Sequence, residues 1–117
     1  MLIFGSQTQY HLCCTAVDIR KGFDGLCGII NNYLQAEPRS GDVFIFLNKN
    51  RTHIKMFCWD GDGYVIFYKR LERGTFDFLK SDSLSRTLKR DELLMILEGI
   101  RIENCKKKKR FLSTKSN

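Results

Sequence analysis

Apolar side chains recur at spacings of three and four between residues 18 and 35, which is the period of an amphipathic helix. They are Ile19, Phe23, Leu26, Ile30 and Leu34. Asp18 stands directly before the first of them, where a side-chain oxygen can cap a helix N-terminus. The pattern therefore predicts a helix from about Asp18 to Gln35 that packs one face on a core.

After a turn at 38–41, three apolar runs predict β-strands over Asp42–Leu47, Thr52–Trp59 and Tyr64–Lys69. The sequences between them, 48–51 and 60–63, are rich in Asn, Asp and Gly, which favour turns. Four-residue loops would place Leu47 opposite Thr52 and Trp59 opposite Tyr64. We therefore expect an antiparallel meander of two hairpins.

Side-chain alternation divides this meander into two faces of different character. The aliphatic face holds Val43, Ile45, Ile54, Met56, Cys58, Val65 and Phe67. The aromatic face, which also carries two polar residues, holds Phe44, Phe46, His53, Lys55, Phe57, Trp59, Tyr64, Ile66 and Tyr68. We expect the first helix to cover the aliphatic face and a C-terminal helix to cover the aromatic one, since large exposed apolar patches are rare on soluble monomers. The alternative is that the aromatic face is an interface.

Residues 71–86 show no sustained period and predict an irregular connection, with a short edge strand toward Leu88. A second amphipathic helix follows, with Asp91 and Glu92 at its positive end and Gly99 as its terminator. Its apolar stripe consists of Leu93, Leu94, Ile96, Leu97 and Ile100. The predicted fold class is α+β: an antiparallel β-meander of three or more strands packed with an N-terminal and a C-terminal helix, in a single domain over residues 1–104.

The charge is unevenly distributed. The 117-residue chain carries a net charge of +7. Residues 101–117 contain seven basic side chains and one acidic side chain, whereas residues 1–100 contain thirteen basic and twelve acidic ones. Residues 105–117 are expected to be a basic, disordered tail, because they offer little apolar surface for burial. The body is nearly neutral.

Several protein classes are disfavoured by composition. No apolar run approaches the roughly 20 residues of a membrane-spanning helix, and the N-terminus lacks a basic leader followed by an apolar stretch. The cysteines are odd in number and none forms a Cys-x-x-Cys pair, which favours reduced, structural thiols. We expect a cytoplasmic protein without membrane contact.

No constellation for catalysis is evident, and we expect no enzyme activity, metal, cofactor or small-molecule substrate. The sequence 60–63, DGDG, resembles the start of a calcium loop, but Tyr64 and Leu71 stand where oxygen ligands would be needed. A hairpin turn is the simpler interpretation. His11 and His53 are the only histidines, and neither is predicted beside a nucleophile.

Binding surfaces are better supported. Cations surround the two hairpins and fill the tail, and they are candidates for DNA contact: Lys49, Arg51, Lys55, Lys69, Arg70, Arg73, Lys106, Lys107, Lys108, Lys109 and Arg110. The interleaved rings of Phe57, Trp59, Tyr64 and Tyr68 are candidates for a partner surface. Two alternatives stay open: basic residues also blunt sheet edges against aggregation, and a lysine tail can simply solubilise.

Three stretches together resemble one family: DIRKGFDGL at 18–26, SGDVFIFLNKNRTHIKMFCWDGDGYVIFYKRLERGTF at 40–76 and LLMILEGI at 93–100. They are similar to the TnpB-type accessory protein encoded by the second reading frame of bacterial insertion sequences of the IS-sixty-six type. The resemblance covers about residues 10–102. It implies a mobile-element context and a role beside a separate transposase, without a known catalytic activity. The Cys13–Cys14 pair and the lysine-rich tail depart from the pattern.

Three hypotheses follow, in order of preference. The first is an adaptor that contacts the transposase of the same element through the aromatic face or the hairpin surface. The second is a DNA-binding protein that grips transposon ends through the tail and hairpin cations. The third, a nuclease subunit, is disfavoured because a two-metal site needs three or four converging acidic residues and none are evident.

Overall fold

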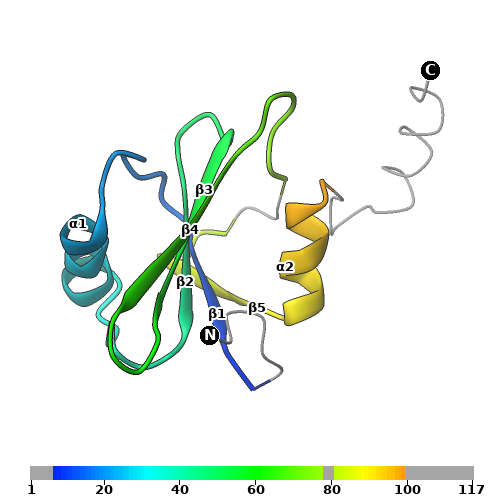
Figure 1. The fold of residues 1–117 in the computed structure, drawn as a ribbon. Coiled ribbons are helices and arrows are strands. Elements are labelled where there is room, and N and C mark those ends of the chain that lie inside the picture. Colours follow the sequence, from blue (N-terminus) through cyan, green and yellow to red (C-terminus); the bar gives the residue numbers. More distant parts are fainter. Residues whose placement is uncertain (1–6, 78–80, 100–117) are drawn as a thin grey trace.

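A five-stranded sheet with one helical layer on each side forms the body of the protein (Figure 1). The structure is a computed structural model that describes residues 7–77 and 81–99. The strands are β1 (Tyr10–Cys13), β2 (Val43–Leu47), β3 (His53–Trp59), β4 (Tyr64–Arg70) and β5 (Ser85–Leu88), in the spatial order β4-β3-β2-β1-β5. The helical segments are α1 (Phe23–Gly28), η1 (Ile29–Tyr33) and α2 (Arg90–Leu97).

The predicted meander is confirmed in β2, β3 and β4, which pair antiparallel, with Trp59 opposite Tyr64. The predicted pairing of Leu47 with Thr52 is wrong, because Leu47 lies opposite Ile54. The Asn48 side chain explains the longer loop: its Oδ1 accepts the backbone N–H groups of Thr52 (2.9 Å) and His53 (3.0 Å). The shift is two residues, so every side chain keeps its predicted face.

The expectation of a purely antiparallel sheet is corrected by β1, which pairs parallel to β2 and antiparallel to β5. The short edge strand predicted toward Leu88 is present as β5. β1 has only four residues. A run that short carries too little alternation to be distinguished from a loop. Its parallel pairing makes the segment between β1 and β2 a crossover that carries α1 and η1.

The first helix is shorter than predicted and does not begin at Asp18. The carboxylate of Asp18 instead accepts the backbone N–H of Arg20 (2.9 Å) and pairs with its guanidinium (2.8 Å), which closes a turn before the helix. Gly22 is the residue at the N-cap of α1. After Gly28 the helix continues as the π-helical segment η1, in which the Leu34 N–H donates to the Ile29 carbonyl at 2.9 Å.

The two predicted faces exist, but the helices cover the opposite ones. The aromatic face packs under α1 and η1 in one cluster: Cys13, Leu26, Ile30, Phe44, Phe46 and Phe57. The aliphatic face packs under α2 in a second cluster that includes Val43, Ile45, Ile54, Met56, Leu93 and Ile96. The face covered by a crossover helix depends on which side of β2 the preceding strand lies. Because β1 was not predicted from the sequence, the sequence did not specify which helix covers which face of the sheet.

The C-terminal helix begins and ends as predicted. Glu92 in its first turn accepts the Lys89 backbone N–H at 2.9 Å, and Gly99 adopts a left-handed φ of 84° after the last turn. The Gly99 N–H reaches the Ile96 carbonyl at 3.0 Å. Ile100, predicted to belong to this helix, lies outside the described residues. Among the described residues, no helix has the length and apolar character needed to cross a membrane.

Candidate partner and nucleic-acid interface

A cluster of Arg39, Trp59 and Tyr64 stands at the turn end of the β3–β4 hairpin. The rings of Trp59 and Tyr64 meet edge to face with centroids 5.0 Å apart. The Arg39 guanidinium lies 4.7 Å from the Trp59 ring centroid, and Arg39 Nε donates a hydrogen bond to the Tyr64 hydroxyl at 3.3 Å. Tyr64 also packs on Phe57, at 4.8 Å between centroids. We call Arg39, Trp59 and Tyr64 the hairpin cluster.

Arg39 is a member of the hairpin cluster that the sequence pattern does not indicate. It follows Pro38 in the connection between η1 and β2, where no periodic pattern marks a residue as part of a surface. Contact with Trp59 on β3 brings it to the hairpin. The available signal was weak: an arginine in a turn next to a strand that carries aromatic residues.

Tyr68 is the most accessible of the predicted partner residues. It lies on β4 with 52% of its surface exposed. Trp59 and Tyr64 are half-buried. Phe57 is fully buried under α1 and η1, so its assignment to the partner surface is corrected. Alternation places a residue on a face but does not say whether a neighbouring element covers it.

The prediction that Lys55 contacts DNA is also corrected. Only 9% of Lys55 is exposed, and its ammonium donates a hydrogen bond to the Lys21 carbonyl at 2.9 Å. The same nitrogen lies 4.8 Å from the Tyr68 ring centroid. These contacts satisfy a charge that would otherwise be costly to bury. Lys55 therefore ties β3 to the segment before α1.

The cations on β4 and in the loop after it do not converge on one surface. Lys69 donates to the Leu97 carbonyl on the α2 side at 3.2 Å, and Arg70 pairs with Glu72 at 3.1 Å. Arg73 is exposed in the loop after β4. The predicted tail cations Lys106, Lys107, Lys108, Lys109 and Arg110 lie outside the described residues.

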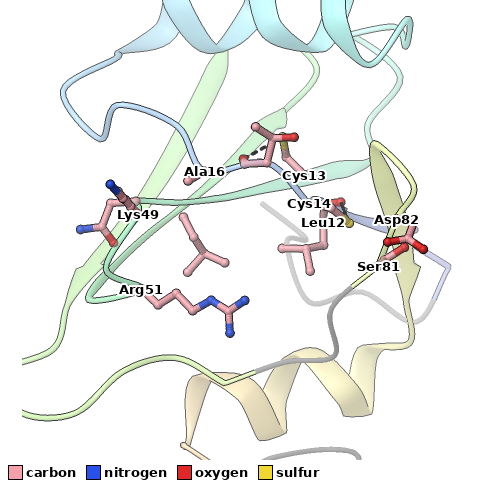
Figure 2. A pocket seen from close by; sticks show the side chains of 11 residues that line it. Leu12, Cys13, Cys14, Ala16, Lys49, Arg51, Ser81 and Asp82 are labelled. Atoms are coloured by element: carbon pink, nitrogen blue, oxygen red, sulfur yellow. Dashed lines mark hydrogen bonds between the residues drawn. The ribbon is translucent and has the colours of Figure 1, made fainter.

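Lys49 and Arg51 line one pocket, shown in Figure 2. Its volume is about 360 Å³, and it lies where the parallel strands β1 and β2 both end. The two cations stand on one side, and Ser81 and Asp82 stand on the opposite side (Figure 2). The rest of the lining is Leu12, Cys13, Cys14, Thr15, Ala16, Leu47 and Asn48. Carboxyl ends of parallel strands are a common place for ligand contacts.

The thiols near this pocket are poor nucleophiles. Burial raises the pKa of the Cys13 and Cys14 thiols, so both are largely protonated near neutral pH. All four described cysteines, including Cys27 and Cys58, are free. Within residues 7–77 and 81–99, no group of three or more His, Cys, Asp or Glu side chains is placed to hold a metal ion.

The DGDG segment is a hairpin turn in which the Asp60 N–H reaches the Gly63 carbonyl at 2.8 Å and Gly61 has a φ of 84°. Both histidines make local structural contacts. His11 pairs with Asp42 at 2.9 Å, which ties β1 to the residue before β2. His53 Nδ1 lies 2.8 Å from the Thr52 hydroxyl.

One protein-family model matches most of this chain. The model described as "IS66 Orf2 like protein" matches residues 8–107, which include every described strand and helix. The uncharacterized protein y4jC of Sinorhizobium fredii (strain NBRC 101917 / NGR234) is 30% identical over 92 residues, 79% of this chain and 79% of the relative. The uncharacterized protein y4hO of the same organism is 28% identical over 100 residues, 86% of this chain and 87% of the relative. No solved structure matches the chain.

Proposed function

The chain belongs to the family of IS66 Orf2 like proteins, and from that premise we propose that it is a non-catalytic adaptor to the transposase of the same insertion sequence. The family places it among accessory proteins of transposition. Its chemistry agrees with a binding role, because an exposed arginine, Arg39, and an exposed aromatic ring, Tyr68, lie on the hairpin's aromatic face.

The observation that carries the adaptor proposal is the hairpin cluster, together with the exposed ring of Tyr68. Trp, Tyr and Arg are the residue types that dominate the energetic centres of protein interfaces. Arg39, Trp59 and Tyr64 already hold one another in place by ring and hydrogen-bond contacts. A surface fixed in advance loses less conformational entropy on binding than a mobile one. We assign this surface to transposase docking.

Calorimetric titration of purified transposase with the parent chain and two variants tests this. We expect Arg39→Ala and Tyr68→Ala each to weaken binding about tenfold or more, a loss of about 1.4 kcal/mol. Leu84→Ala is the matched control, because Leu84 is 50% exposed and stands in the segment before β5. Unchanged affinity in both hairpin variants would refute the adaptor surface.

A second component of the proposal is DNA contact. Lys49 and Arg51 line one pocket, and the chain's net charge is +7. Deleting residues 105–117 is expected to flatten the salt dependence of duplex binding by about four to five units of slope, if the five cations at 106–110 each displace a counterion. The loss should be independent of DNA sequence, since phosphate contacts carry no base information.

Salt titrations of element-end and random duplexes, with full-length and truncated protein, measure this component. Equal slopes would mean that the tail does not engage DNA, leaving the adaptor role alone. Tight preference for element ends without transposase would favour a stand-alone DNA-binding protein of transposon ends. Strand cleavage in magnesium or manganese, abolished by one Asp→Asn change, would favour the nuclease alternative.

A further inference from the structure

Strand β4 forms an open edge of the sheet. In the order β4-β3-β2-β1-β5, it has β3 on one side and no strand on the other within the part of the chain that the structure describes. β4 has seven residues, longer than β5 at the opposite edge with four. Phe67 and Tyr68, on its two faces, are 37% and 52% exposed. Long edges with exposed apolar side chains tend to pair with another strand.

The hydrogen bonds at the ends of the β3–β4 hairpin establish which backbone groups point outward. The Asp60 N–H donates to the Gly63 carbonyl at 2.8 Å, and the Leu71 N–H donates to the Thr52 carbonyl at 2.9 Å. In an antiparallel pair, hydrogen-bonded and non-bonded positions alternate. The backbone groups of Tyr64, Ile66, Tyr68 and Arg70 therefore point away from β3, toward the open edge.

We propose that the protein forms a two-fold symmetric dimer in which β4 pairs antiparallel with β4 of a second copy. The two five-stranded sheets then join into one of ten strands. With the axis at Phe67, Ile66 lies opposite the partner's Tyr68, and Tyr64 lies opposite the partner's Arg70. All four outward-pointing residues gain backbone hydrogen bonds in this register.

Charge selects a second copy as the occupant of this edge. The turn before β4 carries Asp60 and Asp62, whereas the far end of β4 carries Lys69, Arg70 and, beyond Glu72, Arg73. Antiparallel pairing of β4 with itself places the acidic turn of one copy near Lys69, Arg70 and Arg73 of the other at both ends of the interface, and this attraction outweighs the like-charge pair of Asp62 opposite the partner's Glu72. A parallel pairing would place like charges together, which opposes association.

Side chains support the same arrangement. The pairing places an isoleucine opposite a tyrosine twice, and β-branched residues opposite aromatic ones stabilise antiparallel ladders. On the α2 side, Phe67 meets the partner's Phe67, which removes an exposed ring from water. Trp59 lies on β3, one strand in from the edge, so the dimer presents the hairpin cluster twice.

Disulfide trapping tests the register without transposase or DNA, so its failure is distinct from failure of the adaptor proposal. Phe67 sits at a non-hydrogen-bonded position on the axis, where opposite Cα atoms approach to about 4.5 Å, within disulfide range. We expect Phe67→Cys to form covalent dimers at least tenfold faster than Val65→Cys under mild oxidation. Val65 is the control because it shares the face of Phe67 but lies opposite the partner's Lys69. The parent chain gives the background rate of covalent dimer formation through the native cysteines.

Sedimentation velocity over a concentration series gives a second test that needs no added cysteine. Tyr68→Pro removes an outward N–H without removing a bond to β3, a position where an edge strand tolerates proline. We expect its dimer dissociation constant to exceed that of Tyr68→Ala at least tenfold. Arg70→Glu should weaken the dimer, and adding Asp62→Arg should restore it. A parent chain that stays monomeric throughout, or equal cross-linking of Phe67→Cys and Val65→Cys, would overturn the proposal.

Discussion

The two ends of the aromatic face differ in what covers them. Phe44, Phe46 and Phe57 lie under α1 and η1 and are buried. Toward β4, Trp59 and Tyr64 are half-buried and Tyr68 is open to solvent. Both ends follow the same alternation and are rich in the same residue types. The difference shows that aromatic character alone does not tell whether a residue belongs to the core or to an interface. What decides is how far the short helical segment α1–η1 extends over the sheet.

The largest contrast is expected between Phe57→Ala and Tyr68→Ala. Truncation of the fully buried Phe57 leaves a cavity and should lower the free energy of unfolding by about 3–5 kcal/mol. Tyr68→Ala, at an exposed position, should lower it less, by about 0.5–2 kcal/mol, because it removes the ring beside the Lys55 ammonium. Urea unfolding followed by circular dichroism measures both. Similar losses would mean that the two ends are parts of one core.

A smaller effect tests which helix covers the face. Ile30 and Phe57 belong to the same buried cluster, whereas Leu93 belongs to the cluster on the α2 side. A double-mutant cycle of Ile30→Val with Phe57→Leu should give a coupling energy of about 0.5–3 kcal/mol. The matched cycle of Leu93→Ala with Phe57→Leu should be additive within about 0.5 kcal/mol. Coupling of Phe57 with Leu93, together with additivity of Phe57 and Ile30, would mean that α2 covers the aromatic face, as expected from the sequence.

At the open end, the hairpin cluster should contribute less to stability than to binding. Arg39→Ala removes the cation above Trp59 and should cost about 0.5–1 kcal/mol of unfolding free energy, as expected for an exposed cation–π contact. The chain has one tryptophan, so its fluorescence reports this site alone. Arg20→Ala, which changes a cation distant from Trp59 in sequence, serves as the control. An unchanged emission spectrum in Arg39→Ala would contradict the contact.

The weakest effect is expected in the segment that leads into the covering helix. Hydrogen bonds from Arg20 hold the pKa of the Asp18 carboxyl well below its usual range. A depressed folded-state pKa contributes stability above the unfolded pKa of about 3.9, and this contribution is lost as pH falls further. An NMR titration of the Asp18 carboxyl should show the low pKa in the parent chain. In Arg20→Ala the pKa should return toward about 3.9; if it does not, the Arg20 side chain is not the main cause.

The elements that could be predicted from the sequence are those with a local pattern. Alternation located β2, β3 and β4, and acidic residues with a terminal glycine located α2. The resemblance stated from the motifs agrees with the family-model match over residues 8–107. The start of α1 was misplaced because Asp18 engages Arg20 instead of a helix end. An Asp before an apolar stripe suits either structure.

The candidate site was predictable only in part. Lys55 and Phe57 were assigned to surfaces because alternation ignores cover, and their burial depends on the segment around α1. Lys49 and Arg51 do lie together, since both flank one short loop and line the same pocket. Arg39 reaches the hairpin through a contact between residues 20 positions apart, for which the sequence offers no period.

The placement of β1 between β2 and β5 has a consequence for the order of folding. The hairpins of β2, β3 and β4 close over short loops, whereas β1 must find β2 more than 30 residues away, with Tyr10 paired to Val43. Long-range pairing is slower because the intervening chain loses more entropy. Pulse-labelled hydrogen exchange should therefore protect amides in 43–70 before those in 10–13; simultaneous protection would contradict this order. Since β1 leaves the ribosome before its two partners exist, the N-terminal strand waits for the rest of the sheet.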